Sequence, residues 1–238
     1  LAALKEEIDL EKLGPVFEAI ELIKNALPSE TSLIGFCGAP WTVASYMIAG
    51  KGTPDQKPAR LFAYEKPELF QRLIDLLVRG SIDYLERQFV AGVESVQIFD
   101  SWAGVLPQNE FERWCLKPIL AIVEGLKARV PHARIIAFPR GVGSHLEAFT
   151  NHSGINALSL DTSADVNWVA REIQSKKTVQ GNLDPFALIA GGRALDESVD
   201  RIKKAFDGKP YIFNLGHGIL PETPIAHVEQ LVARVRGA

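Results

Sequence analysis

Polar side chains that could do chemistry stand directly after short apolar runs of the sequence. Ser101 and Arg140 each follow such a run, and His217 lies between two glycines just beyond another. A hydroxyl and an imidazole can donate hydrogen bonds to a carboxylate, and a guanidinium can form a charge-assisted pair with one. Because the formal net charge is only −3, any anionic ligand would have to be held by local groups of this kind. Each also has a structural interpretation, because Ser101 could cap the following turn and Arg140 could pair with a neighbouring acid.

For two further side chains, the sequence allows either a role in the site or a structural role. Asp100 ends an apolar run, where its carboxylate could take part in catalysis or accept hydrogen bonds from backbone amides. Tyr46 lies in the amphipathic segment 45–49, where a tyrosine often packs its ring and keeps only its hydroxyl in water. The remaining histidines are interpreted as surface or packing residues: His132, His145, His152 and His227.

The common cofactor and metal motifs are missing from the sequence. The segment Gly50-Lys51-Gly52-Thr53 echoes a P-loop, but Ser45 occupies the position of its required first glycine. No Gly-x-Gly-x-x-Gly follows the first apolar run, no His-Glu-x-x-His occurs, and no His-x-Cys is partnered by a second cysteine. A Gly-x-Ser-x-Gly hydrolase elbow is also missing. We therefore expect no bound metal and no organic cofactor.

Six short and nearly continuous apolar runs predict β-strands, and the stretches between them predict helices. Runs of this kind suit strands covered on both faces, so the repeated strand–helix units indicate a parallel sheet. The predicted strands are 32–37, 95–100, 134–138, 157–160, 178–180 and 211–215, and the predicted helices are 16–26, 69–90, 111–128, 164–175, 196–206 and 224–236. Thr223 is the expected N-cap of the last helix, with Pro224 at its first position.

Glycine or polar residues follow all six predicted strands, and this bears on the choice between two α/β folds. An open doubly wound sheet gathers its ligand at one crevice, whereas a (β/α)8 barrel builds its site from many strand ends. We therefore favour a barrel. Since the sequence has no linker-like stretch and no strong internal repeat, residues 1–238 are expected to form a single domain.

The composition is that of an ordinary globular protein without affinity for polyanions. Of the 238 residues, 47% are hydrophobic and 23% are charged, and the formal net charge is −3. Such a charge gives no general attraction to nucleic acid or to a membrane surface. No apolar run reaches the ~18 residues of a membrane span, and no secretory leader is recognisable. Because Cys37 and Cys115 lie in apolar surroundings, we expect a reducing, cytoplasmic location without disulfides.

Three groups of residues, in this order along the chain, resemble the uroporphyrinogen decarboxylase family. They are Gly35-Phe-Cys-Gly-Ala-Pro-Trp-Thr with Ser45-Tyr-Met-Ile-Ala-Gly-Lys-Gly, then Ile98-Phe-Asp-Ser-Trp-Ala-Gly, and finally Gln180-Gly-Asn-Leu-Asp-Pro with Asn214-Leu-Gly-His-Gly-Ile. One group alone would be weak, but the ordered set is specific. The resemblance extends over about residues 32–238.

This resemblance implies a (β/α)8 TIM barrel, usually a homodimer, that works without a metal or an organic cofactor. It also implies a flexible tetrapyrrole substrate, uroporphyrinogen III, whose four acetate side chains are decarboxylated to methyls to give coproporphyrinogen III in haem biosynthesis. The matching active-site positions are Tyr46, Ser101 and His217, and the matching pocket positions are Phe36, Gly38 and Phe99. Arg140 joins them as a residue that could bind a substrate carboxylate.

The implied reaction fits these residue types. Loss of CO₂ from a pyrrole acetate leaves electrons that need a sink, and protonation of the adjacent ring carbon creates one. The site therefore needs an acid and groups that orient the carboxylate, which Tyr46, Ser101 and His217 could supply. Phe36 and Phe99 would form an apolar wall where a leaving carboxylate loses its solvation.

The match has a gap near the start of the chain. No part of Leu1–Glu30 resembles the arginine-rich segment or the aspartate with which the family holds its substrate. In family terms the chain holds about six βα units and lacks the first two strands, so we expect a longer whole molecule. Two alternatives stay open. A zinc-dependent corrinoid or thiol methyltransferase would contain zinc, and a non-catalytic tetrapyrrole-binding remnant would bind porphyrin without turnover.

Overall fold

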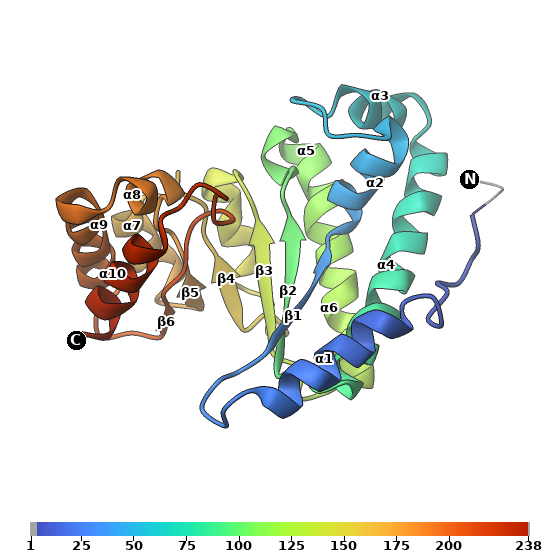
Figure 1. Cartoon of the computed structure of the whole chain (residues 1–238). Coiled ribbons are helices and arrows are strands. Elements are labelled where there is room, and N and C mark those ends of the chain that lie inside the picture. Colours follow the sequence, from blue (N-terminus) through green and yellow to red (C-terminus); the bar gives the residue numbers. More distant parts are fainter. Residues whose placement is uncertain (1–3, 238) are drawn as a thin grey trace. The chain divides into compact units, whose positions relative to one another are not determined.

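The computed structural model describes residues 4–237, which fall into two compact units (Figure 1). The first comprises residues 4–142 and 152–156, and the second comprises residues 143–151 and 157–237. Each unit contains three parallel strands that pair in chain order, together with helices. The single domain expected for residues 1–238 stays a prediction.

Three parallel strands form the centre of the first unit. They are β1 (Ile34–Gly38), β2 (Ser95–Asp100) and β3 (Ile135–Pro139). Their register places Gly38 beside Phe99, and Phe99 in turn beside Phe138. All of β3 is buried, in keeping with its continuous apolar sequence.

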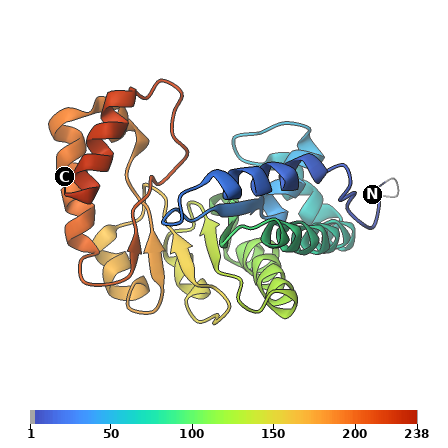
Figure 2. The same ribbon diagram turned by 60° about the horizontal axis from the view of Figure 1, so that its bottom comes forward.

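Helices pack against these strands, and α4 and α6 lie side by side (Figures 1 and 2). The helices of this unit are α1 (Gly14–Ala26), α2 (Pro40–Ala49), α3 (Lys57–Glu65), α4 (Pro67–Val90), α5 (Gln108–Phe111) and α6 (Lys117–Arg129). An aromatic cluster joins α2 and α4 to the turn between α5 and α6. The ring of Phe70 on α4 lies 5.8 Å from that of Trp41 on α2 and 4.7 Å from that of Trp114. Burial of these large rings stabilises the packing of α2 against α4.

The second unit repeats the strand–helix pattern with shorter strands. Its strands are β4 (Ala157–Ser159), β5 (Thr178–Gln180) and β6 (Tyr211–Ile212), and its helices are α7 (Val166–Trp168), α8 (Pro185–Ala190), α9 (Gly192–Ala205) and α10 (Ile225–Arg236). Helix α10 packs on α8 and α9 (Figure 2). Beyond β6, a single parallel bridge between Leu183 and Leu215 continues the pairing with the segment after β5.

The six predicted strands are confirmed in position, although β6 ends three residues earlier than expected. Four predicted helices are confirmed with small shifts in their ends, and the other two are interrupted. The predicted helix 111–128 contains a π-helical turn at Glu112–Leu116, and the predicted helix 164–175 consists of α7 and a π-helical turn at Val169–Ile173. Helices α2, α3 and α8 were not predicted, since each is ten residues or fewer and so too short for a periodic pattern to stand out in the sequence.

The prediction that Thr223 caps the last helix is wrong. Helix α10 begins at Ile225, and its N-cap is Pro224, which accepts no hydrogen bond through its side chain. The backbone of Pro224 is extended, with φ −64° and ψ 134°, so the proline lies outside the helix. Within the described part of the chain, the buried Thr223 hydroxyl has no hydrogen-bond partner.

Candidate active site

An aromatic row runs across one face of β1–β3. Phe36 and Phe99 meet edge to face with their ring centroids 5.9 Å apart, and Phe99 meets Phe138 in the same way at 5.7 Å. The row follows from the register, because neighbouring strands bring these alternate residues to the same face. Phe36 is 60% exposed, so the row presents an apolar surface at β1. Two predicted pocket residues are thus in contact, and the third, Gly38, is the strand partner of Phe99.

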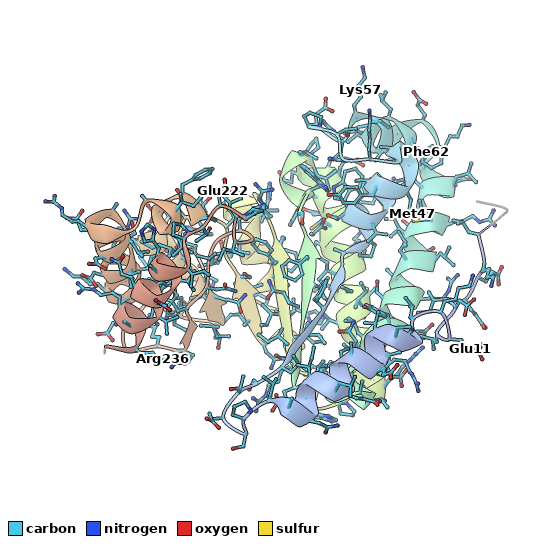
Figure 3. The ribbon with its side chains drawn as sticks, viewed as in Figure 1. Glu11, Met47, Lys57, Phe62, Glu222 and Arg236 are labelled. Carbon is cyan, nitrogen blue, oxygen red and sulfur yellow. The ribbon has the colours of Figure 1, made fainter. Side chains whose placement is uncertain are left out.

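Helix α2 follows β1 directly and carries Tyr46 in its last turn. Pro40 stands at the start of this helix, where its missing N–H and fixed φ are favourable. Gly50 ends the helix in the left-handed conformation, with φ 69°, and its N–H bonds to the carbonyl of Tyr46 at 2.8 Å. The Tyr46 ring lies 6.4 Å from that of Trp102 and is 43% exposed, and the next residue, Met47, is exposed too (Figure 3).

Ser101 is the first residue after β2 and is half-buried. The short 3-10 turn that follows, Ala103–Val105, has Trp102 as its N-cap and no side-chain capping bond. The interpretation of Ser101 as a cap of this turn is therefore wrong. Ser101 directly precedes Trp102, the residue whose ring contacts that of Tyr46.

Asp100, the last residue of β2, is completely buried. The hydroxyl of Thr42 on α2 donates to its Oδ1 atom at 2.6 Å. The interpretation of Asp100 as an acceptor for backbone amides stays a prediction. Burial raises the pKa of Asp100 from its ordinary 3.8 to about 6, while the hydrogen bonds from Thr42 and from the thiol of Cys115 oppose this rise.

Arg140 follows β3, and its backbone joins the ends of two strands. Its N–H donates to the carbonyl of Asp100 at 3.0 Å, and its own carbonyl accepts from the N–H of Gly104 at the same distance. The loops approach so closely that a Cβ atom on Gly104 would lie 2.6 Å from the carbonyl oxygen of Gly141. Among residues 4–237 the guanidinium forms no salt bridge, so the alternative in which Arg140 pairs with a neighbouring acid is wrong.

His217 belongs to the second unit and lies exposed in the loop after β6. The segment before it is fixed to the loop after β5, because the N–H of Gly216 donates to the carbonyl of Leu183 at 2.8 Å. Gly216 also packs against the loop after β4, since a Cβ atom on Gly216 would lie 2.6 Å from the backbone N atom of Thr162. The first glycine of the Gly-His-Gly segment is thus required by this close approach.

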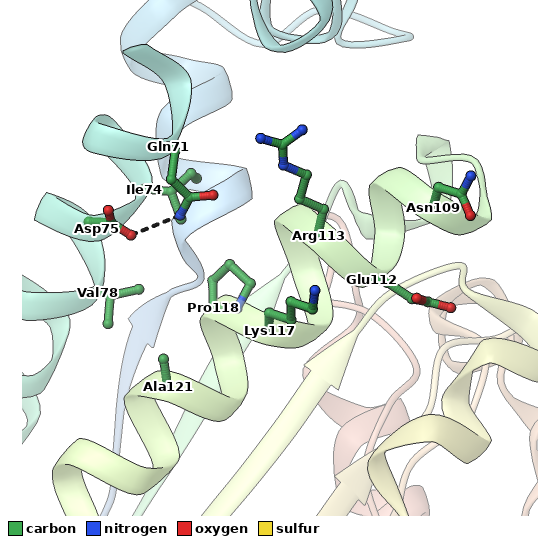
Figure 4. Close-up of a pocket in the computed structure, with 10 residues that line it drawn as sticks. All are labelled: Gln71, Ile74, Asp75, Val78, Asn109, Glu112, Arg113, Lys117, Pro118 and Ala121. Carbon is green, nitrogen blue, oxygen red and sulfur yellow. Dashed lines mark hydrogen bonds between the residues drawn. The ribbon is translucent and has the colours of Figure 1, made fainter. Parts of the chain in front are cut away.

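A groove of the first unit lies elsewhere, between α4 and the α5–α6 segment (Figure 4). It encloses about 500 Å³, and its charged lining residues are Asp75, Glu112, Arg113 and Lys117. None of the predicted site residues lines it. The groove is therefore not the predicted site.

Residues 4–237 contain no group of three or more His, Cys, Asp or Glu side chains arranged to hold a metal ion. Over that range no helix combines the length and the apolar character that crossing a membrane would need.

Comparison with known proteins gives a consistent result. The family model described as uroporphyrinogen decarboxylase (URO-D) matches residues 1–238. The chain belongs to this family. It is 51% identical over 225 residues to a uroporphyrinogen decarboxylase of Chelativorans sp. (strain BNC1), covering 94% of this chain and 66% of that protein. It is 50% identical over 234 residues to a uroporphyrinogen decarboxylase of Brucella anthropi, and this match covers 98% of this chain and 68% of that protein. The chain thus spans about two thirds of the length of these curated relatives.

Solved structures with a similar fold are more distant in sequence. A methyltransferase from Methanosarcina mazei superposes with a TM-score of 0.76 at 21% identity, covering 93% of this chain and 63% of that one. A B12-independent methionine synthase from Shewanella sp. gives a TM-score of 0.64 at 12% identity, covering 92% and 64%. At these identities the likeness concerns the fold alone. With the family match, it confirms the predicted fold class, an α/β TIM barrel represented here by an incomplete set of six βα units.

Six of the seven predicted site residues lie in the first unit, at the carboxyl ends of β1–β3 and on α2, and His217 lies in the second. Trp41 and Thr42 belong to the first family motif, but the sequence predicted no role for either residue. Both side chains bond to the segment after β2. A threonine in the first turn of a helix has many ordinary uses, so no local signal in the sequence marks this contact.

Proposed function

We propose that the protein is a uroporphyrinogen decarboxylase, which removes the four acetate carboxyls of uroporphyrinogen III without a cofactor to give coproporphyrinogen III. Membership of the family and about 50% identity to curated relatives of that name support the proposal. The structural observation that carries it is the aromatic row Phe36–Phe99–Phe138, with Ser101 and Arg140 at the adjoining strand ends.

This arrangement suits a pyrrole ring that bears an acetate. The aromatic face offers apolar contact to the ring and leaves a carboxylate poorly solvated, which favours loss of CO₂. Ser101 and Tyr46 supply hydroxyl donors that could orient the carboxylate, and Arg140 supplies a cation that no acid among the described residues neutralises. His217 is proposed as a further active-site donor from the second unit. The substrate's own electron-rich ring, once protonated, accepts the electrons of the breaking bond, so the step needs no external electron sink.

The decisive assay is anaerobic incubation of the purified chain with uroporphyrinogen, followed by oxidation and separation of the products by carboxyl number. Products with seven down to four carboxyls are expected. An unchanged eight-carboxyl substrate, from a sample shown to be folded by circular dichroism, would contradict the proposal for this chain.

A matched pair of variants tests the role of Tyr46. Tyr46→Phe removes only a hydroxyl, and we expect kcat to fall by about 10–100-fold, since a hydrogen bond to a charged group contributes about 1.5–3 kcal/mol. Tyr64→Phe removes the same group from another exposed tyrosine, on α3, and should leave kcat unchanged. Equal activities of the two variants would remove Tyr46 from the site.

Three further expectations from the sequence belong to the same proposal: a single domain, a homodimer and a cytoplasmic location. Sedimentation velocity of the purified chain tests the homodimer, because the monomer has a mass of 26.1 kDa. A single species at that mass over the micromolar range would contradict the homodimer.

A further inference from the structure

Helix α2 holds both backbone polar groups of Trp102 with two consecutive side chains. The Trp102 N–H donates to the Thr42 hydroxyl at 3.2 Å, and the Trp102 carbonyl accepts from the Trp41 indole N–H at 3.0 Å. A residue just after a strand thereby gains the fixed geometry that a regular strand would give it. Ser101 lies between this anchored residue and the buried Asp100, so its backbone is held from both sides.

The Thr42 hydroxyl can make both of its contacts in only one way. A hydroxyl carries one proton, and the Trp102 N–H is a donor, so the Thr42 oxygen must accept there. Its own proton then points to Asp100 Oδ1, 2.6 Å away. Residue 100 must therefore present an acceptor, and a carboxylate satisfies this need.

The same contacts fix Tyr46. Thr42 and Tyr46 are four residues apart on α2 and so lie on one face of the helix. One end of this face bonds to the backbone of Trp102, while the Tyr46 ring lies against the Trp102 ring. A displacement of α2 from the end of β2 would break these contacts together, and it would move Tyr46 away from Ser101.

Stability alone explains the buried acid poorly. A buried carboxylate is costly to desolvate, and apolar side chains of similar volume often replace buried polar groups without loss of stability. Both Asp100 and Thr42 are buried, so neither can reach a substrate in solvent. We propose that Thr42 and Asp100 are positioning residues, whose hydrogen bond holds Ser101 and Tyr46 at the distance that decarboxylation requires. This inference rests on the proposed function of the site.

The test compares Thr42→Val, which keeps the shape but removes the hydroxyl, with Thr42→Ser, which keeps the hydroxyl. Thr42→Val should lower kcat by about 10–100-fold with KM changed by less than about threefold, since misplacement by about 1 Å can cost this much and the lost interaction acts in the transition state. Thr42→Ser should restore most of kcat. In the matched control, Thr150→Val, a buried threonine hydroxyl that donates to the Glu147 carbonyl is lost without effect on kcat.

A second pair addresses the acceptor. Asp100→Asn keeps an oxygen for the Thr42 proton and should retain most of kcat, whereas Asp100→Leu should resemble Thr42→Val. Wild-type kcat in Thr42→Val would overturn the inference, and so would an equal loss in Thr42→Ser or in Thr150→Val. Equal activity of the two Asp100 variants would overturn it as well.

Hydrogen exchange does not depend on catalytic turnover, so it tests this inference separately from the proposed function. Labelling with ¹⁵N-tryptophan marks only the four tryptophans, so exchange of the Trp102 amide and the Trp41 indole proton can be followed by NMR. Thr42→Val should speed both exchanges and Thr42→Ser should not. Unchanged exchange in Thr42→Val would refute the hydrogen bonds themselves, whether or not the wild-type chain decarboxylates its substrate.

Discussion

Replacing Asp100 with asparagine should remove a pH-dependent cost that burial imposes on the folded protein. The carboxyl is completely buried, and its pKa is about 6 in the folded state against an ordinary 3.8. A carboxyl whose pKa is raised on folding binds its proton more tightly in the folded state. It therefore favours folding at low pH, and this contribution is lost as the pH rises from about 4 through 6.

The magnitude follows from the two pKa values. At about 1.36 kcal/mol for each pH unit, their difference corresponds to about 3 kcal/mol between strongly acidic and neutral solution. Over the accessible range from pH 4.5 to 7.5, the wild-type free energy of unfolding should fall by about 2 kcal/mol relative to that of Asp100→Asn. The neighbouring thiol of Cys115 does not titrate in this range, because burial and the adjacent Asp100 raise its pKa well above its ordinary value.

The assay is urea unfolding of both proteins at pH 4.5, 6.0 and 7.5, followed by the fluorescence of the buried tryptophans. All other titrating groups are shared, so the difference between the two proteins isolates residue 100. A difference that stays constant within about 0.5 kcal/mol, or one that changes in the opposite direction, would refute the argument that burial controls this carboxyl.

Three further predictions concern the first unit. Gln88→Leu should lower the free energy of unfolding by about 1–3 kcal/mol in urea titrations, because the Gln88 amide bonds to both the N–H and the carbonyl of a β1 residue at 2.9 Å. Gly104→Ala should lower the free energy of unfolding by a similar amount in the same titration, since the Cβ atom of the new alanine would lie 2.6 Å from the carbonyl oxygen of Gly141. The thiols of Cys37 and Cys115 should not react with a colorimetric thiol reagent at pH 8 until urea unfolds the protein. Both side chains are buried, and burial raises the pKa of Cys37 to about 12. Prompt reaction of either thiol in the native protein would contradict this prediction.

Much of the fold follows from local sequence. The continuous apolar runs of β1–β5 identify these strands because such runs can be buried on both faces. The order of the short motifs identifies the family. Residues that matched family positions by motif, such as Phe36 and Phe99, indeed meet in space, since alternate residues of paired strands share a face.

Local sequence failed where a contact depends on another element. Thr223 has the residue type of an N-cap, but the chain enters α10 one residue later with an extended Pro224. Helix α2 carries a weak amphipathic pattern, because its start is buried and held by the end of β2. Propensity describes what a segment prefers alone, and tertiary packing overrides it.

For the same reason, the sequence alone could not predict the hydrogen-bond partners of buried polar groups. Thr42 and Asp100 are separated by 58 positions, and Gln88 and Phe36 by 52. A hydrogen bond requires its two atoms to meet within about 3 Å in a defined direction, and only the packing of helices on strands sets such positions. The sequence alone determined the kind of fold and the family, whereas the tertiary structure decided which side chains hold the proposed site in place.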